Sequence, residues 1–66
     1  MYGERIKEVR EDEYLTQREF AAILGIGQPY LSKIESEQCG LSVELIIKIC
    51  TYFKVTADYL LGMSDQ

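Results

Sequence analysis

Two short amphipathic segments joined by a glycine, within residues 15–35, constrain this sequence more than any other feature. In the first segment, Thr16 and Glu19 have the spacing of a capping box, in which each side chain accepts a hydrogen bond from the other residue's backbone N–H. Gly25 follows the segment, and glycine enters the left-handed conformation of a helix end without a Cβ penalty. The pattern therefore predicts a helix over residues 17–24 that ends in a tight turn.

A second helix is expected over residues 28–36. Pro29 falls in its first turn, where a missing N–H costs nothing, and Leu31 and Ile34 share one face at helical spacing. The opposite face is short, polar and nearly uncharged, and it consists of Gln28, Pro29, Ser32, Lys33 and Ser36. Gln, Ser and Lys side chains can hydrogen-bond to base edges in a DNA major groove. A plain solvated helix face is the alternative interpretation.

A family resemblance rests on the residues of these two helices. Gln17, Ala21, Gly25 and the run Ser32-Lys33-Ile34-Glu35 resemble the helix-turn-helix of the Cro and phage-repressor family of DNA-binding domains, the XRE type. The similarity extends over nearly the whole chain, from about residue 5 to residue 61. It implies an all-α, five-helix, lambda-repressor-like fold in which the second and third helices form the helix-turn-helix.

The remaining sequence predicts three further helices of the same single domain (1–66), over residues 3–13, 43–53 and 57–61. Ile6 and Val9 give the first of these an inward stripe, and Ser42 and Thr56 are expected to cap the other two. Lys54 stands where the family often has a helix-ending glycine. Either Lys54 is left-handed, at a cost of about 1 kcal/mol, or this helix ends differently.

Charge is the feature that fits DNA binding least well. The 66 residues carry 11 acidic and 7 basic side chains, a formal net charge of -4, whereas nucleic-acid binders usually present a basic patch. We therefore expect either that the fold places the acids away from DNA, or that DNA affinity is modest. The sequence shows no membrane span or signal peptide, so a cytoplasmic location is expected.

The two cysteines match no metal-ligand spacing, and the chain has no histidine. Cys50 is expected to be a small buried hydrophobe. Cys39 is expected in a loop, where it could be exposed and a redox role stays open. Because the chain also lacks a nucleophile with a plausible base, we expect neither an enzyme nor a metal or cofactor.

The side chains of the expected helix-turn-helix suggest roles for individual residues, and the resemblance implies two of them: a phosphate clamp for Gln17 and the pairing of Arg10 with Glu35. Base contacts are expected from Gln28, which can pair in bidentate fashion with adenine, and from Pro29, Ser32 and Lys33. Phosphate contacts are expected from Gln17, Arg18, Tyr30, Gln38 and Ser42. Arg10 and Glu35 are expected to form a structural ion pair between the first and third helices.

These features together predict a sequence-specific transcriptional regulator that binds double-stranded DNA, with a repressor favoured over an activator. One module reads few base pairs, so we expect a homodimer on a palindromic site. Tyr59, Leu61 and Met63 are candidates for its interface, or they simply close the core. A regulatory protein partner is left open. The alternative function is a protein-interaction module of the same fold that has lost tight DNA binding.

Overall fold

The computed structural model describes residues 1–63, and this part of the chain folds into helices without any strand. The helices are α1 (Tyr2–Asp12), α2 (Gln17–Leu24), α3 (Gln28–Glu35), α4 (Val43–Phe53) and α5 (Ala57–Leu60). The predicted all-α, five-helix fold is confirmed. Helices α2 and α4 have the expected bounds, α1 lies one residue earlier, and α3 and α5 end one residue earlier. The end of the predicted domain, residues 64–66, lies outside the described residues.

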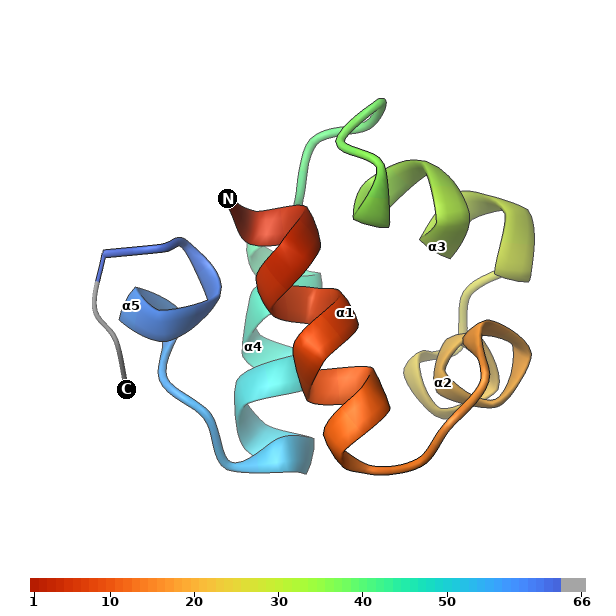
Figure 1. Ribbon diagram of the computed structural model, residues 1–66, viewed down its shortest axis with the longest axis horizontal. Helices are drawn as coiled ribbons and strands as arrows, with labels where there is room; N and C mark the ends of the chain where they lie inside the picture. Colours follow the sequence, from red (N-terminus) through yellow and green to blue (C-terminus); the bar gives the residue numbers. More distant parts are fainter. Residues whose placement is uncertain (64–66) are drawn as a thin grey trace.

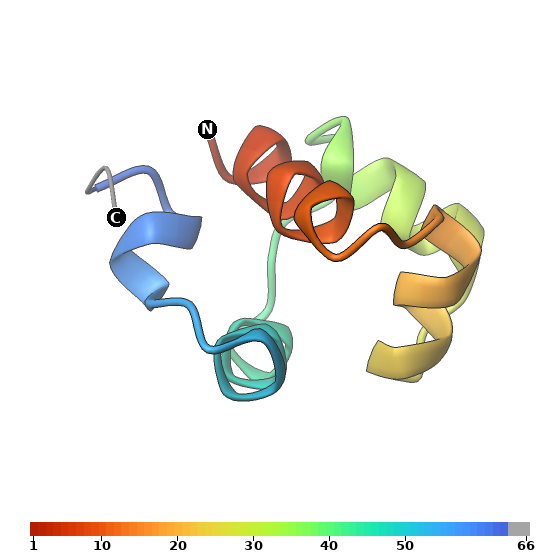
Figure 2. The same ribbon diagram turned by 60° about the horizontal axis from the view of Figure 1, so that its bottom comes forward.

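The helices surround one small core (Figures 1 and 2). Helix α1 lies across α4, α2 and α3 lie together at one end, and α5 lies at the other end. All five helices contribute buried side chains to the core, which consists of Ile6, Val9, Phe20, Ala21, Leu24, Leu31, Ile34, Leu45, Ile49 and Leu60. The rings of Phe20 and Phe53 stack at 4.9 Å between centroids and join α2 to α4.

The local signals at the helix ends are confirmed. The Thr16 hydroxyl accepts the N–H of Glu19 at 3.1 Å, and the Glu19 carboxylate accepts the N–H of Thr16 at 2.9 Å. Gly25 ends α2 in the left-handed conformation, with φ 72°. Ser42 and Thr56 cap α4 and α5 through their hydroxyls. Lys54 is left-handed, with φ 58°, so the first of the two expectations for this residue is correct.

The first turn of α1 is bound to the loop that follows α3. The Glu37 carboxylate accepts the Gly3 N–H at 3.0 Å, and the Tyr2 hydroxyl donates to the Cys39 carbonyl at 2.6 Å. Gly3 is buried, and a Cβ placed on it would overlap the carbonyl oxygen of Glu35. Glycine is therefore required here for the close approach of α1 to the end of α3. These contacts fix the loop beside the helix-turn-helix.

Candidate nucleic-acid interface

The outward face of α3 has the polar character that the sequence predicts. Gln28, Pro29, Tyr30 and Lys33 are exposed, and Ser32 is half-buried. Leu31 and Ile34 point into the core and hold the helix against the rest of the fold. The first backbone N–H groups of a helix have no intrahelical acceptor, and Gly27 precedes α3 without a side-chain cap, which leaves those of Gln28 and Tyr30 without a side-chain partner; Pro29 has no N–H. The start of α3 therefore presents free donors together with the Gln28 amide.

A chain of hydrogen bonds runs beneath this face and ends at Gln28. Arg10 contacts Glu35 through two nitrogens, Nε to Oε2 at 2.8 Å and Nη2 to Oε1 at 3.2 Å. Gln17 Nε2 donates to Glu35 Oε1 at 3.0 Å, and Gln28 Nε2 donates to Gln17 Oε1 at 2.8 Å. The structure thus brings together the two members of the expected ion pair and connects them to the first residues of α2 and α3.

The chemistry of the chain fixes the orientation of each amide. An ionised Glu35 only accepts hydrogen bonds, so Gln17 must turn its NH2 group toward it and its oxygen toward Gln28. Gln28 must then donate to Gln17 with one of its two N–H groups. Its other N–H and its Oε1 remain available, and this donor and acceptor are the pair that adenine N7 and N6 require.

Arg10 and Glu35 are largely removed from solvent, with side chains 11% and 6% exposed. The pKa of Arg10 is raised above its ordinary value, chiefly by the hydrogen bond to Glu35, and the arginine stays charged. Its remaining nitrogen, Nη1, donates to the Leu15 carbonyl at 3.0 Å. The pair therefore ties α1, the start of α2 and the end of α3 together.

The residues expected to contact phosphates have different environments. Arg18, Tyr30 and Gln38 are exposed, whereas the Gln17 amide already bridges Glu35 and Gln28. The Ser42 hydroxyl accepts the N–H of Leu45 as the cap of α4, which leaves only its own proton for a ligand. The roles of all the expected base and phosphate contacts stay predictions.

The carboxylates near the helix-turn-helix are held by contacts within the fold. Glu19 accepts its own capping bond, Glu35 is paired with Arg10, and Glu37 caps the first turn of α1. Five further acids lie at exposed positions of α1 and its end, namely Glu4, Glu8, Glu11, Asp12 and Glu13. The Glu37 carboxylate lies at the positive end of the α1 dipole and accepts the Gly3 N–H, so it serves as a cap for that helix.

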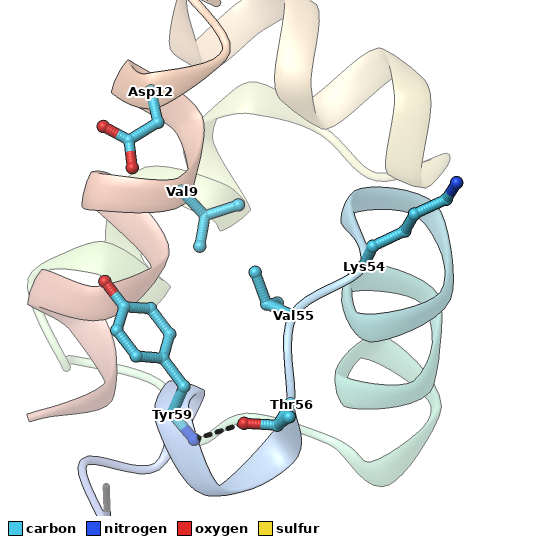
Figure 3. A pocket seen from close by; sticks show the side chains of 6 residues that line it. All are labelled: Val9, Asp12, Lys54, Val55, Thr56 and Tyr59. Carbon is cyan, nitrogen blue, oxygen red and sulfur yellow. Dashed lines mark hydrogen bonds between the residues drawn. The ribbon is translucent and has the colours of Figure 1, made fainter. Parts of the chain in front are cut away.

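The three residues expected at a dimer interface differ in their exposure. The Tyr59 ring is half-buried, lies 4.7 Å from the Arg5 guanidinium and donates through its hydroxyl to Glu8 at 3.2 Å. Leu61 and Met63 are 43% and 73% exposed. Tyr59 also forms one wall of a hollow beside α1, which is shown in Figure 3 and lined by Val9, Asp12, Lys54, Val55, Thr56 and Tyr59.

Some features of the site were not found from the sequence. The hydrogen bond between Gln17 and Gln28 is one of them. Each glutamine is the first residue of its helix, and the two helices are joined by a tight turn. This shared position at the helix starts is the signal from which the contact could have been predicted. Cys39 is half-buried and packs against the core, so it is not the exposed loop residue that was considered. Cys50 is also half-buried, and burial raises the pKa of its thiol.

Within residues 1–63, no helix is long and apolar enough to cross a membrane. The same residues contain no group of three or more His, Cys, Asp or Glu side chains arranged to hold a metal ion.

Comparison with known proteins identifies the class to which this fold and surface belong. The helix-turn-helix family model matches residues 6–60, which is most of the chain. The chain therefore belongs to the XRE-type helix-turn-helix family of DNA-binding domains, and the expected family is confirmed.

Three curated proteins are similar to this chain. Antitoxin PezA of Streptococcus pneumoniae serotype 4 is 42% identical over 62 residues, which are 94% of this chain and 39% of that protein. The HTH-type transcriptional regulator ImmR of Bacillus subtilis is 35% identical over 96% of this chain and 50% of its own length. The B. subtilis HTH-type transcriptional regulator YobD is 26% identical over the whole chain and 59% of its length. The chain thus spans between about two fifths and three fifths of these relatives.

Proposed function

We propose that this chain is a sequence-specific transcriptional regulator that reads double-stranded DNA with α3 in the major groove. The observation that carries the proposal is the chain of hydrogen bonds from Arg10 to Gln28. It holds one exposed amide at the start of α3 with a free donor and a free acceptor. Major-groove readers place the N-terminal residues of this helix against base edges. Two relatives named as transcriptional regulators support the regulatory role.

The active form in this proposal is a homodimer on a palindromic operator, acting as a repressor. The described domain measures 27 × 23 × 19 Å, whereas the half-sites of such operators lie about 34–36 Å apart. One domain cannot span that distance, but two neighbouring domains can each present an α3 to successive major grooves. Exposed Leu61 and Met63 are the candidates for the contact between copies. Blocking a promoter requires no surface beyond the one that binds DNA, which favours repression.

The test begins with selection of bound duplexes from a random library at low and near-physiological salt. The proposal expects enrichment of a palindrome with half-sites about one helical turn apart. Gln28→Ala should then weaken binding to the selected duplex by about 1–3 kcal/mol and relax the preference at one base pair.

Gln38→Ala is the matched control, since it removes another exposed glutamine that is expected to contact only phosphate. It should weaken binding to selected and random duplexes alike. If Gln28→Ala behaved in the same uniform way, the assignment of Gln28 as a base reader would be wrong.

A protein-interaction module of the same fold is the second candidate. An exposed apolar groove between α2 and α4, lined by Ile23, Ile47 and Tyr52 among others, favours it, as does the net charge of -4. The polar face of α3 argues against it, since interface centres are usually enriched in aromatic residues. No enriched duplex at either salt concentration would favour this candidate over the regulator.

A further inference from the structure

Tyr14, in the turn between α1 and α2, is an outlier in both backbone and side chain. Its φ is 57°, in the left-handed region, which a residue with a Cβ adopts only at a cost. Its side chain is 93% exposed, so packing does not offset that cost. The aromatic ring at this position therefore does not contribute to the packing of the fold. Strained residues without a packing role concentrate at functional sites.

The backbone around Tyr14 is held firmly beside the helix-turn-helix. The Tyr14 N–H donates to the Glu11 carbonyl at 2.9 Å, and the next residue, Leu15, donates to the Arg10 carbonyl at 3.1 Å. The Leu15 carbonyl in turn accepts from Arg10 Nη1. Tyr14 is therefore fixed directly beside the arginine that begins the chain of hydrogen bonds leading to Gln28.

Tyr14 also lies close to the expected phosphate contact at the start of α2. Gln17 lies three positions further along the chain, and three residues of extended chain span at most about 11 Å. Gln17 is the first residue of α2, and the N–H groups there have no intrahelical acceptor. A phosphate bound at this helix start would place its neighbour on the same strand within reach of a side chain from the preceding turn.

We propose that the Tyr14 hydroxyl donates a hydrogen bond to a DNA backbone phosphate beside the one that meets Gln17, an inference that rests on the proposed function. Tyrosine is among the side chains that bind phosphate oxygens in this way. Because the residue lies on a turn and not on α3, its contact fixes orientation and carries no sequence information.

The test uses Tyr14→Phe and Tyr14→Gly, with Tyr52→Phe as the control. Tyr52 is 63% exposed on α4 and lines the groove with Ile23. Dissociation constants are measured by fluorescence anisotropy on the selected duplex and on a random duplex, over a series of salt concentrations. Tyr14→Phe should weaken binding about tenfold on both duplexes, because hydrogen bonds to charged groups are the stronger class. The salt dependence should not change, since tyrosine neutralises no phosphate charge.

Tyr14→Gly separates binding from folding. It should lose the same factor in affinity while raising the melting temperature, because glycine relieves the left-handed strain. Tyr52→Phe should bind like the unmodified chain.

Three results would overturn the Tyr14 proposal. Unchanged binding in Tyr14→Phe, while Gln28→Ala loses its base preference, would reject the Tyr14 contact and leave the proposed function standing; Tyr14 would then be a candidate for a protein contact. A loss confined to the selected duplex would show a base contact instead of a phosphate contact. Failure of the unmodified chain to bind any duplex would reject both proposals together.

Discussion

Replacing Glu35 by glutamine tests the hydrogen-bond chain with the smallest change in shape. The Glu35 carboxylate accepts three N–H groups, two from Arg10 and one from Gln17. An amide at this position has only one oxygen, and its NH2 group would face a donor from either Arg10 or Gln17. The substitution therefore leaves one donor unpaired and removes the charge that balances Arg10.

The expected loss of stability follows from the burial of the pair. Removing one partner of a buried ion pair costs about 3–5 kcal/mol. Arg10 keeps its bond to the Leu15 carbonyl and is 11% exposed, so the lower end of that range applies. For a domain of this size each kcal/mol changes the melting temperature by roughly 4–8 °C. Glu35→Gln should therefore lower the melting temperature by about 12 °C or more.

The assay is thermal and urea unfolding followed by circular dichroism, with a double-mutant cycle. Glu13→Gln, which alters an exposed carboxylate at the end of α1, should change stability by less than about 0.5 kcal/mol. Arg10→Met combined with Glu35→Gln should be more stable than the sum of the single losses predicts, because no buried charge is then left unpaired. Strictly additive losses, or a melting temperature within a few degrees of the unmodified chain, would refute the coupling of Arg10 with Glu35.

Two further substitutions test the backbone of the fold. Gly3→Ala should lower the free energy of unfolding by about 1–3 kcal/mol, since the new Cβ would overlap the Glu35 carbonyl. Gly40→Ala is the control, because a Cβ at Gly40 would have no atom within 4 Å. It should leave the free energy of unfolding nearly unchanged in the same urea titration. Lys54→Gly should raise the free energy of unfolding by about 1 kcal/mol, because Lys54 ends α4 in the left-handed conformation, with φ 58°. A lower melting temperature would contradict this. It would show that the lysine side chain stabilises the end of α4 by more than its backbone strain destabilises it.

Local signals in the sequence predicted the helices, since each depends on residues close together in the chain. The capping residues Thr16, Ser42 and Thr56 and the left-handed Gly25 act within one helical turn. The Arg10–Glu35 pair was expected only through the family resemblance, because its members are 25 residues apart. Nothing in the order of residues brings an arginine in one helix toward a glutamate in another.

The contacts missed from the sequence are those that depend on how the helices pack. The Gln17–Gln28 bond requires the starts of α2 and α3 to meet, which follows from the turn at Gly25 and not from either glutamine. Glu37 reaches Gly3 across 34 residues, and the half-burial of Cys39 follows from the same docking of the loop on α1. In the fold the Glu37 carboxylate thus serves as a cap for α1.

The distribution of charge also bears on how this domain would recognise DNA. Three of its basic residues are engaged within the fold: Arg5 lies over Tyr59, Arg10 is paired, and Lys48 donates to the Leu24 carbonyl. Arg18 and Lys33 are the basic side chains on α2 and α3, and both are exposed. Since non-specific affinity depends on the number of phosphates neutralised, this surface gains little from charge alone. Under the proposed function, affinity would come more from oriented hydrogen bonds, and the largely buried Arg10–Glu35 pair orients the Gln28 amide, through Gln17, before any DNA is bound.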